Sequence, residues 1–437
     1  MNFAESLSYL LSLGHETLAL KLGLRNTELL LERLGNPQQH YESVQIAGTN
    51  GKGSTAAMLY SICRAAGISA GLYTSPHLRC ITERIEINGR QISQSEFARQ
   101  ASEVRAGAED LLTEGKIEAL PTFFEHVTAI ALNAFREAGV KLAILETGLG
   151  GRLDATTVAG AKTVGITSIS LDHQEHLGET LEEIAFEKAA IIRAGVTAVV
   201  APQSAAALAV ITKRADECEV ELSLNGCRAR ETGTRPSGLF DVTFETEANR
   251  YENVHLALPG RHQIANACLA LRLAESLRGR GFNIPQSAIV KGIETARHVG
   301  RLSRHGSSGS MLLDGAHNPA AARALRDYLD EFVPEPVTLV FGAMSDKPLA
   351  EMAAVLFPGV HRLILTRPNN PRAAAVDSLQ TLAANFVPAE RIIAAPCVSE
   401  ALQKAREVTP DGGVICVTGS LYLIGEATAE LDPILQS

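Results

Sequence analysis

Several features are missing from this 437-residue chain, and each absence argues against a class of protein. No apolar run is long enough to span a membrane, and the first residues lack the basic segment and apolar core of a secretory signal. Seven cysteines are scattered without a Cys-x-x-Cys pair, which argues against a zinc or disulfide framework. We therefore expect reduced thiols, a cytoplasmic location and no membrane partner.

An excess of basic charge is missing as well. The chain has 40 Lys and Arg against 49 Asp and Glu, a formal net charge of −9, so we expect no nucleic-acid partner. Apolar residues make up 46% and charged residues 20%, as in an ordinary globular protein. The length exceeds what one hydrophobic core usually supports, which predicts two domains.

The most informative stretch is VQIAGTNGKGSTAAMLYSICRAA, residues 44–66. An apolar run predicts a buried strand, the glycines predict a turn, and residues from Ala56 onward have helical composition. Backbone N–H groups of such a turn and the following helix N-terminus converge on a phosphate. Lys52 would supply positive charge, and Ser54 or Thr55 a hydroxyl for Mg²⁺. The spacing differs from the common GxxxxGK[ST] pattern, because only two residues separate Gly48 from Gly51 and Gly53 stands between Lys52 and Ser54. We therefore predict a nucleoside triphosphate site of a less common subtype.

Strands alternate with helices in both halves of the chain, which predicts an α/β fold with two parallel-sheet domains. We predict a P-loop NTPase-like domain over residues 1–295, a linker over 296–303 and a smaller Rossmann-like domain over 304–437. In the first domain, the pattern predicts a strand ending at Asp172-His173, a helix over 180–194 and short antiparallel strands over 220–255. In the second, it predicts helices near 319–332, 347–356, 375–385 and 398–407.

Two candidate metal ligands follow predicted strands, where α/β sheets bind their ligands. Glu146 comes directly after the apolar stretch from Val140 to Leu145, and a carboxylate there would suit Mg²⁺ beside the phosphate loop. The alternative is a carboxylate that caps the following glycine-rich turn. His173 is a candidate second ligand, although a lone histidine is more often structural.

Lys188 is a third unusual residue. It shares one predicted helical face with apolar residues at three- and four-residue spacing, namely Leu181, Ile184, Ala185 and Ile192. A desolvated lysine has a lowered pKa and can react with CO₂ to form an anionic carbamate, which a second Mg²⁺ would favour. The alternative is a lysine whose stem is buried while its ammonium group reaches solvent.

A set of ordered motifs along nearly the whole chain resembles the folylpolyglutamate synthase/dihydrofolate synthase family of the Mur ligase superfamily. The motifs are GTNGKGS (48–54), TSPHL (74–78), TFFE (122–125), ETGLGGRLDATT (146–157), DH…LG (172–178), EKAAIIR (187–193), HQ…NA (262–267), GR (300–301), LDGAHNP (313–319), FGAMSDK (341–347), TRP (366–368) and VTGSLYLIGE (417–426).

The resemblance implies a role for each matching residue. ATP would be bound by Gly51, Lys52, Gly53, Ser54, Asn266, Arg301 and Asp314. Ser75 and Glu146 would hold a first Mg²⁺, and His173 with carbamylated Lys188 a second. The catalytic groups would be Lys52, Lys188 and His317. The folate substrate would lie against Thr122, Phe123, Phe124, Glu125, Arg152, Leu153 and Asp154.

The implied reaction is ATP-dependent addition of L-glutamate to a folate through an acyl phosphate. The resemblance favours the bacterial form that acts on both dihydropteroate and a tetrahydrofolate, in a monomeric enzyme. Because an acyl phosphate hydrolyses readily, we expect the second domain to close and exclude water, with Arg301, Asp314 and His317 coupling closure to ATP.

Four alternatives are weaker. A related Mur-type ligase would act on a cell-wall precursor or another acidic acceptor, but the TFFE and GRLD segments favour a folate. A GTPase-like switch would need an Asn-Lys-x-Asp sequence, and a dehydrogenase a Gly-x-Gly-x-x-Gly turn after the first strand of the second domain; we find neither. A catalytically silent scaffold has no support while Lys52, Glu146, His173 and Lys188 are all present.

Overall fold

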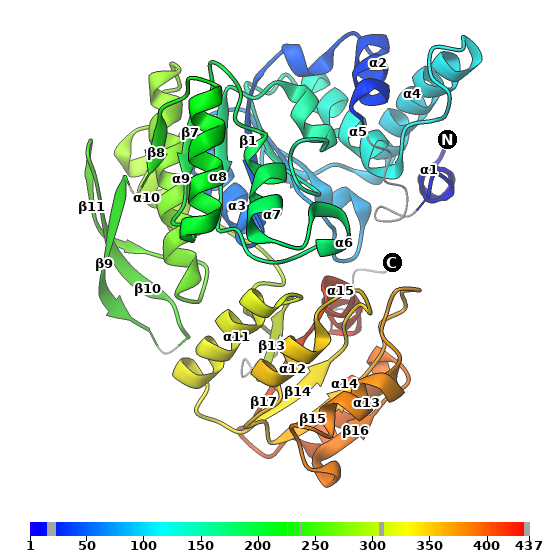
Figure 1. Ribbon diagram of the computed structural model, residues 1–437, viewed down its shortest axis with the longest axis vertical. Helices are drawn as coiled ribbons and strands as arrows, with labels where there is room; N and C mark the ends of the chain where they lie inside the picture. The colour runs from blue at the N-terminus through cyan, green and yellow to red at the C-terminus, as the bar shows by residue number, and fades with distance from the viewer. Residues whose placement is uncertain (15–22, 225, 236, 306–309, 432–437) are drawn as a thin grey trace.

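The computed structural model describes residues 1–14, 23–224, 226–235, 237–305 and 310–431. It confirms an α/β fold in two domains, one above the other in Figure 1, each built on a large and mostly parallel sheet. The first domain is built on an eight-stranded sheet in the order β4-β3-β2-β5-β1-β6-β7-β8. Its strands are β1 (Glu42–Ala47), β2 (Ala70–Tyr73), β3 (Ile85–Ile87), β4 (Arg90–Gln91), β5 (Leu142–Glu146), β6 (Thr163–Ile166), β7 (Thr197–Val200) and β8 (Leu222–Leu224).

Helices cover both faces of this sheet because its central strands are apolar on both sides. The helices are α1 (Phe3–Ser12), α2 (Arg25–Arg33), α3 (Lys52–Ala65), α4 (Gln94–Thr113), α5 (Phe123–Glu137), α6 (Gln174–Leu177), α7 (Leu181–Ala189), α8 (Ala205–Glu217), α9 (His262–Gly279) and α10 (Gln286–Thr295). The short 3₁₀ helices are η1 (Pro37–Gln39), η2 (Ile81–Arg84) and η3 (Ala155–Ala159). Within the described ranges, no helix is long and apolar enough to cross a membrane.

The register of the central strands determines where a ligand-binding site can form in the first domain. The central strand β1 lies between β5 and β6 and is parallel to both. Ile46 is paired with Glu146, and Ala47 with Ile166, so the C-terminal ends of all three strands meet at one edge of the sheet. The loops that follow these strands therefore converge on the same place, as expected for a ligand-binding edge of an α/β sheet.

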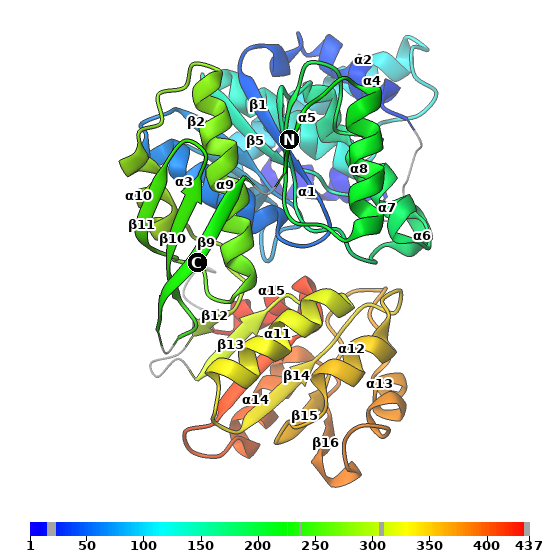
Figure 2. The same cartoon turned by 60° about the vertical axis from the view of Figure 1, so that its left-hand side comes forward.

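A smaller antiparallel sheet lies beside α9 and α10 in Figure 2. It contains β9 (Cys227–Thr234), β10 (Phe240–Thr246) and β11 (Arg250–His255). Its buried residues, including Phe240, Phe244 and Tyr251, belong to the same hydrophobic cluster as residues of α3 and α9. The prediction of antiparallel strands over 220–255 is thus confirmed for these three, whereas β8 is parallel to β7.

The second domain has a six-stranded sheet in the order β12-β13-β17-β14-β15-β16, with only β12 antiparallel. The strands are β12 (Ser303–His305), β13 (Met311–Asp314), β14 (Val337–Phe341), β15 (Arg362–Leu365), β16 (Ile392–Ala394) and β17 (Val414–Thr418). The helices are α11 (Pro319–Phe332), α12 (Leu349–Leu356), α13 (Val376–Ala383), η4 (Ala389–Arg391), α14 (Val398–Val408) and α15 (Leu421–Leu431).

Three predicted boundaries are wrong. The strand predicted to end at Asp172 ends at Ile166, because the backbone turns away toward the phosphate loop, where Thr49 and Asn50 donate to the Ser168 carbonyl. The helix predicted to begin at Ala56 begins at Lys52, and the one predicted to reach residue 194 ends at Ala189. The serine- and glycine-rich residues 306–309 and the end of the predicted second domain, 432–437, lie outside the described residues.

Candidate active site

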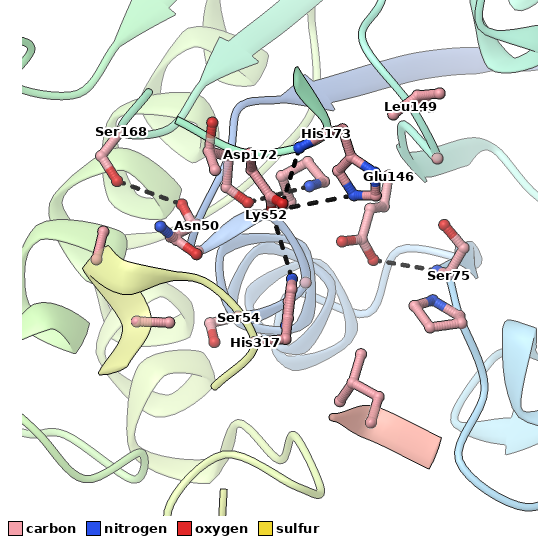
Figure 3. Close-up of a pocket in the computed structure, with 18 of the residues that line it drawn as sticks. Asn50, Lys52, Ser54, Ser75, Glu146, Leu149, Ser168, Asp172, His173 and His317 are labelled. Atoms are coloured by element: carbon pink, nitrogen blue, oxygen red, sulfur yellow. Dashed lines mark hydrogen bonds and ion pairs between the residues drawn. The ribbon is translucent and has the colours of Figure 1, made fainter. Parts of the chain in front are cut away.

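A cavity of about 470 Å³ lies between the two domains, at the C-terminal ends of β1 and β5. Residues of the phosphate loop line it from the first domain, and Asp314, His317 and Lys347 from the second. Figure 3 shows Lys52, Glu146, Asp172, His173 and His317 facing the same space. The cavity lining contains every residue to which the family resemblance assigns an ATP, metal or catalytic role, whereas Thr55, the alternative to Ser54 as a hydroxyl ligand, is buried outside it.

The phosphate loop has the backbone that its glycines permit. Gly48 and Gly51 have φ angles of +143° and +90°, a region that residues with a Cβ rarely adopt. At Gly51 a Cβ atom would lie 2.2 Å from the side-chain oxygen of Asn266, so α9 packs directly on the loop. Lys52 is the first residue of α3, and its Nζ donates to the carbonyls of Gly48 and Thr49, both at 3.2 Å. The Lys52 side chain is thus folded back on the loop backbone.

Lys188 reaches the same loop from α7. This helix starts with a capping box between Thr180 and Glu183, and its buried face includes Ile184 and Ala185 as the periodicity predicts. Lys188 is itself buried, and its Nζ donates to the Gly48 carbonyl at 2.8 Å. The alternative of an ammonium group in solvent is therefore wrong. Burial, followed by the nearby Lys52 charge, lowers the pKa of Lys188 to about 7, so the neutral amine is abundant at neutral pH.

Glu146 is the last residue of β5 and is also buried. Its Oε2 accepts a hydrogen bond from the Ser75 backbone at 3.2 Å. Burial raises the pKa of Glu146, although the Lys52 charge opposes this effect. The glycine-rich turn after β5 is capped by another carboxylate, because Asp154 accepts from the backbone N–H groups of Gly148 and Leu149 at 2.8 and 3.0 Å. Glu146 is therefore directed at the cavity and is not the cap of the turn.

Asp172 joins the two domains, although we predicted no role for it from its sequence motif. Its carboxylate accepts from Lys347 Nζ at 2.6 Å and from Asn318 Nδ2 at 3.0 Å, and His317 Nε2 lies 3.5 Å away. Burial alone would raise the pKa of Asp172, but hydrogen bonding and charge from His317, with His173 and Lys347, hold it well below its ordinary value. The available signals were the motifs DH and FGAMSDK, which did not indicate that their charged residues pair.

His173 follows Asp172 in a left-handed backbone conformation, with φ of +51°. Desolvation lowers the pKa of its ring, which therefore stays neutral and able to ligate a cation. Its Nε2 lies 4.0 Å from the Asp172 carboxylate. Among the residues that the structure describes, no three His, Cys, Asp or Glu side chains gather as a metal site. A cation here would need further oxygen ligands from a nucleotide or from a modified Lys188.

The residues at the domain junction hold one another in place. Arg301 donates to the Gly315 carbonyl at 3.4 Å, and His317 Nδ1 lies 2.8 Å from the same oxygen. Asp314 accepts from the backbone N–H groups of Leu302 and Ala316, both at 3.0 Å. Burial raises the pKa of Asp314, and the Arg301 charge opposes this effect. Two segments of the second domain are thus fixed beside the cavity.

The predicted folate segments divide into two groups. Thr122, Phe124, Glu125, Leu153 and Asp154 line the cavity. The carboxylates among them also shape the backbone: Glu125 closes the capping box at the start of α5 and Asp154 starts η3.

Phe123 and Arg152 are not part of the cavity lining. Phe123 packs in the core, where the Arg84 guanidinium lies 5.5 Å from its ring centre. Arg152 is half exposed and pairs with Glu187 at 2.9 Å.

Comparison with known proteins points to one family. The Mur ligase middle domain matches residues 46–274, and the Mur ligase glutamate ligase domain matches residues 300–421. A dihydrofolate synthase/folylpolyglutamate synthase of Bacillus subtilis is 33% identical over 96% of this chain and 97% of its own length. A solved folylpolyglutamate synthase/dihydrofolate synthase of Yersinia pestis, complexed with AMPPNP and a Mn ion, is 30% identical with a TM-score of 0.85, over 99% of this chain and 98% of that one.

Other relatives are longer. A probable bifunctional folylpolyglutamate synthase/dihydropteroate synthase of Halobacterium salinarum is 35% identical over 98% of this chain. The match covers 51% of that protein, so the chain spans about half the length of this relative.

Proposed function

The chain belongs to the Mur ligase family, among the folylpolyglutamate and dihydrofolate synthases, and we propose on this basis that it is an ATP-dependent ligase that joins L-glutamate to a folate. Its substrates would be dihydropteroate, which yields dihydrofolate, and tetrahydrofolate, whose glutamate tail is extended. One observation carries the proposal: the phosphate-loop Lys52 and the second-domain His317 line the same cavity. That cavity also contains Thr122 and Phe124 from the segment expected to bind folate.

The proposed reaction has two steps. The γ-phosphoryl group of ATP is transferred to a carboxylate oxygen of the folate, which gives an acyl phosphate and ADP. The glutamate amine then attacks the acyl carbon, loses a proton and expels phosphate, leaving an amide. Lys52 would exchange its bonds to the carbonyls of Gly48 and Thr49 for the phosphoryl group, and its charge would stabilise the negative charge on that group during transfer.

The residues present fit a first Mg²⁺. Glu146 is a buried carboxylate beside the phosphate loop, and it accepts a hydrogen bond from the backbone N–H of Ser75. The Glu146 carboxylate and the Ser75 hydroxyl would supply oxygen ligands. When bound, Mg²⁺ would neutralise phosphate charge during transfer. For a second ion, His173 has a neutral ring, but Lys188 would contribute an oxygen only as a carbamate. The pKa of about 7 at Lys188 supplies the neutral amine that reacts with CO₂.

We further propose that the chain acts as a cytoplasmic monomer. Both sides of the cavity come from one chain, so a second copy is not required to complete it. The junction would be residues 296–303, from the end of α10 at Thr295 to Ser303, the first residue of β12. Size-exclusion chromatography with light scattering tests the oligomeric state, and a dimer mass would contradict it.

The central test is ADP release that depends on both L-glutamate and a folate. Dihydropteroate and tetrahydrofolate are supplied separately, and Lys52→Ala serves as the control for contaminating ATPase activity. Turnover with both supports the two-activity enzyme, and turnover with tetrahydrofolate alone restricts it to tail extension. Turnover with neither substrate, while ATP still binds, would contradict the folate assignment and leave a Mur-type ligase with another acceptor.

A further inference from the structure

The segment between the two domains contributes a histidine to the phosphate loop. His298 lies between α10 and β12, three positions before Arg301, and its Nδ1 is 3.2 Å from the Ser54 hydroxyl oxygen. A Cβ at Gly53 would come within 2.6 Å of the His298 ring, so the ring rests on the first turn of α3. This contact explains the unusual glycine between Lys52 and Ser54: a larger residue would displace the histidine.

The hydrogen bonds around Ser54 restrict where its proton can point. The Gln263 side-chain nitrogen donates to the Ser54 oxygen at 3.3 Å, while the Gln263 side-chain oxygen accepts from Asn266 at 2.9 Å. The Ser54 hydroxyl accepts one bond from Gln263, which leaves it one hydrogen and one further lone pair. The contact with His298 Nδ1 suits either tautomer of a neutral ring; in the tautomer with the ring hydrogen on Nε2, Ser54 donates its hydrogen to Nδ1. Desolvation and the Arg301 charge lower the pKa of His298, which agrees with a neutral ring.

When Ser54 donates its hydrogen to His298 and one of its lone pairs accepts from Gln263, one lone pair of the Ser54 oxygen remains unused. We propose that His298 is a positioning residue that directs this lone pair toward the divalent cation of a bound nucleotide. The inference rests on the proposed use of ATP, and not on the identity of the acceptor. It also gives the interdomain segment a direct contact with the nucleotide site, which none of the sequence motifs indicates.

The test compares nucleotide affinity with and without Mg²⁺ by isothermal titration calorimetry, using ADP as the probe. We expect His298→Phe to weaken Mg-ADP binding about tenfold, the effect of one lost hydrogen bond, while metal-free ADP binding stays within about twofold. His298→Asn places an acceptor oxygen near the Nδ1 position and should restore most of the affinity. His298→Gln places its amide farther out and should resemble His298→Phe. Val299→Ala, at a neighbouring residue that is 54% exposed, is the matched control.

The partner variant makes the test specific. Ser54→Ala removes the hydroxyl, so adding His298→Phe to it should cause no further loss of Mg-ADP affinity. Additive losses would overturn the proposal, as would a His298→Phe protein with unchanged Mg-ADP affinity. An equal loss of metal-free and Mg-ADP affinity would also overturn it, because the ring would then only support the loop. These outcomes do not depend on folate turnover, so a failure here is distinct from a failure of the proposed function.

Discussion

Replacing Asp172 by asparagine should weaken the contact between the two domains. The Asp172 carboxylate and the Lys347 ammonium are 2.6 Å apart, and their side chains are only 5% and 7% exposed. Removing one partner of a buried pair costs about 3–5 kcal/mol, because the other charge is left unpaired. We expect the low end, about 3 kcal/mol, since Lys347 can return to water when the domains separate. Any equilibrium between this arrangement and a form in which the domains are separated should therefore shift about a hundredfold toward the separated form.

Small-angle scattering, together with a fluorescence distance between labels on the two domains, measures this shift. Asp172→Asn should increase the radius of gyration and the label distance relative to the wild type. Lys347→Met should do the same, whereas the double variant should recover part of the loss because no buried charge is left unpaired. Unchanged distances in Asp172→Asn would refute the reasoning. Strictly additive effects in the double variant would show that the two residues act independently.

The lowered pKa of Asp172 adds a pH dependence with a definite sign. A carboxylate whose pKa is lower in the folded protein stabilises it above the ordinary aspartate pKa, and this contribution is lost as pH falls toward the folded value. The wild-type contact should therefore persist at pH 5 and weaken only in stronger acid. Asp172→Asn should lack this acid-dependent component when label distances are measured across the same pH range.

Three further predictions concern the phosphate loop and its neighbours. Gly51→Ala should reduce ATP affinity at least tenfold by calorimetry, because it strains a φ of +90° and collides with Asn266; unchanged affinity would contradict this. Glu146→Gln should stabilise the ligand-free protein by roughly 1 kcal/mol in urea, since it removes a buried charge, yet abolish Mg²⁺-dependent ADP release. For Lys188, whose folded pKa is about 7, the unfolded chain binds the extra proton, so stability should rise between pH 7 and about pH 10. Lys188→Met should lack that rise.

Much of the fold followed from local pattern. The apolar run and glycines around residue 48 predicted β1, the phosphate loop and α3, and the predicted helix over 319–332 matches α11. The apolar stripe around Lys188 left two alternatives, a buried amine and an ammonium group in solvent, and the structure shows that the side chain is buried. These features can be predicted from the sequence because a strand or helix that faces a core repeats its apolar residues at a fixed spacing, whatever it packs against.

The contacts between distant segments could not be derived in this way. Lys347 meets Asp172 across 175 residues, and His298 meets Ser54 across 244. Each pair depends on the order of strands in the sheet and on how one domain lies against the other. The sequence by itself determined most strands and helices, though not all of their ends, and it marked Lys52, Glu146 and Lys188 as chemically unusual but not Asp172 or His298. Only the tertiary structure decided which of those side chains pair, because hydrogen bonds and ion pairs require positions within a few ångströms and local periodicity carries no such information.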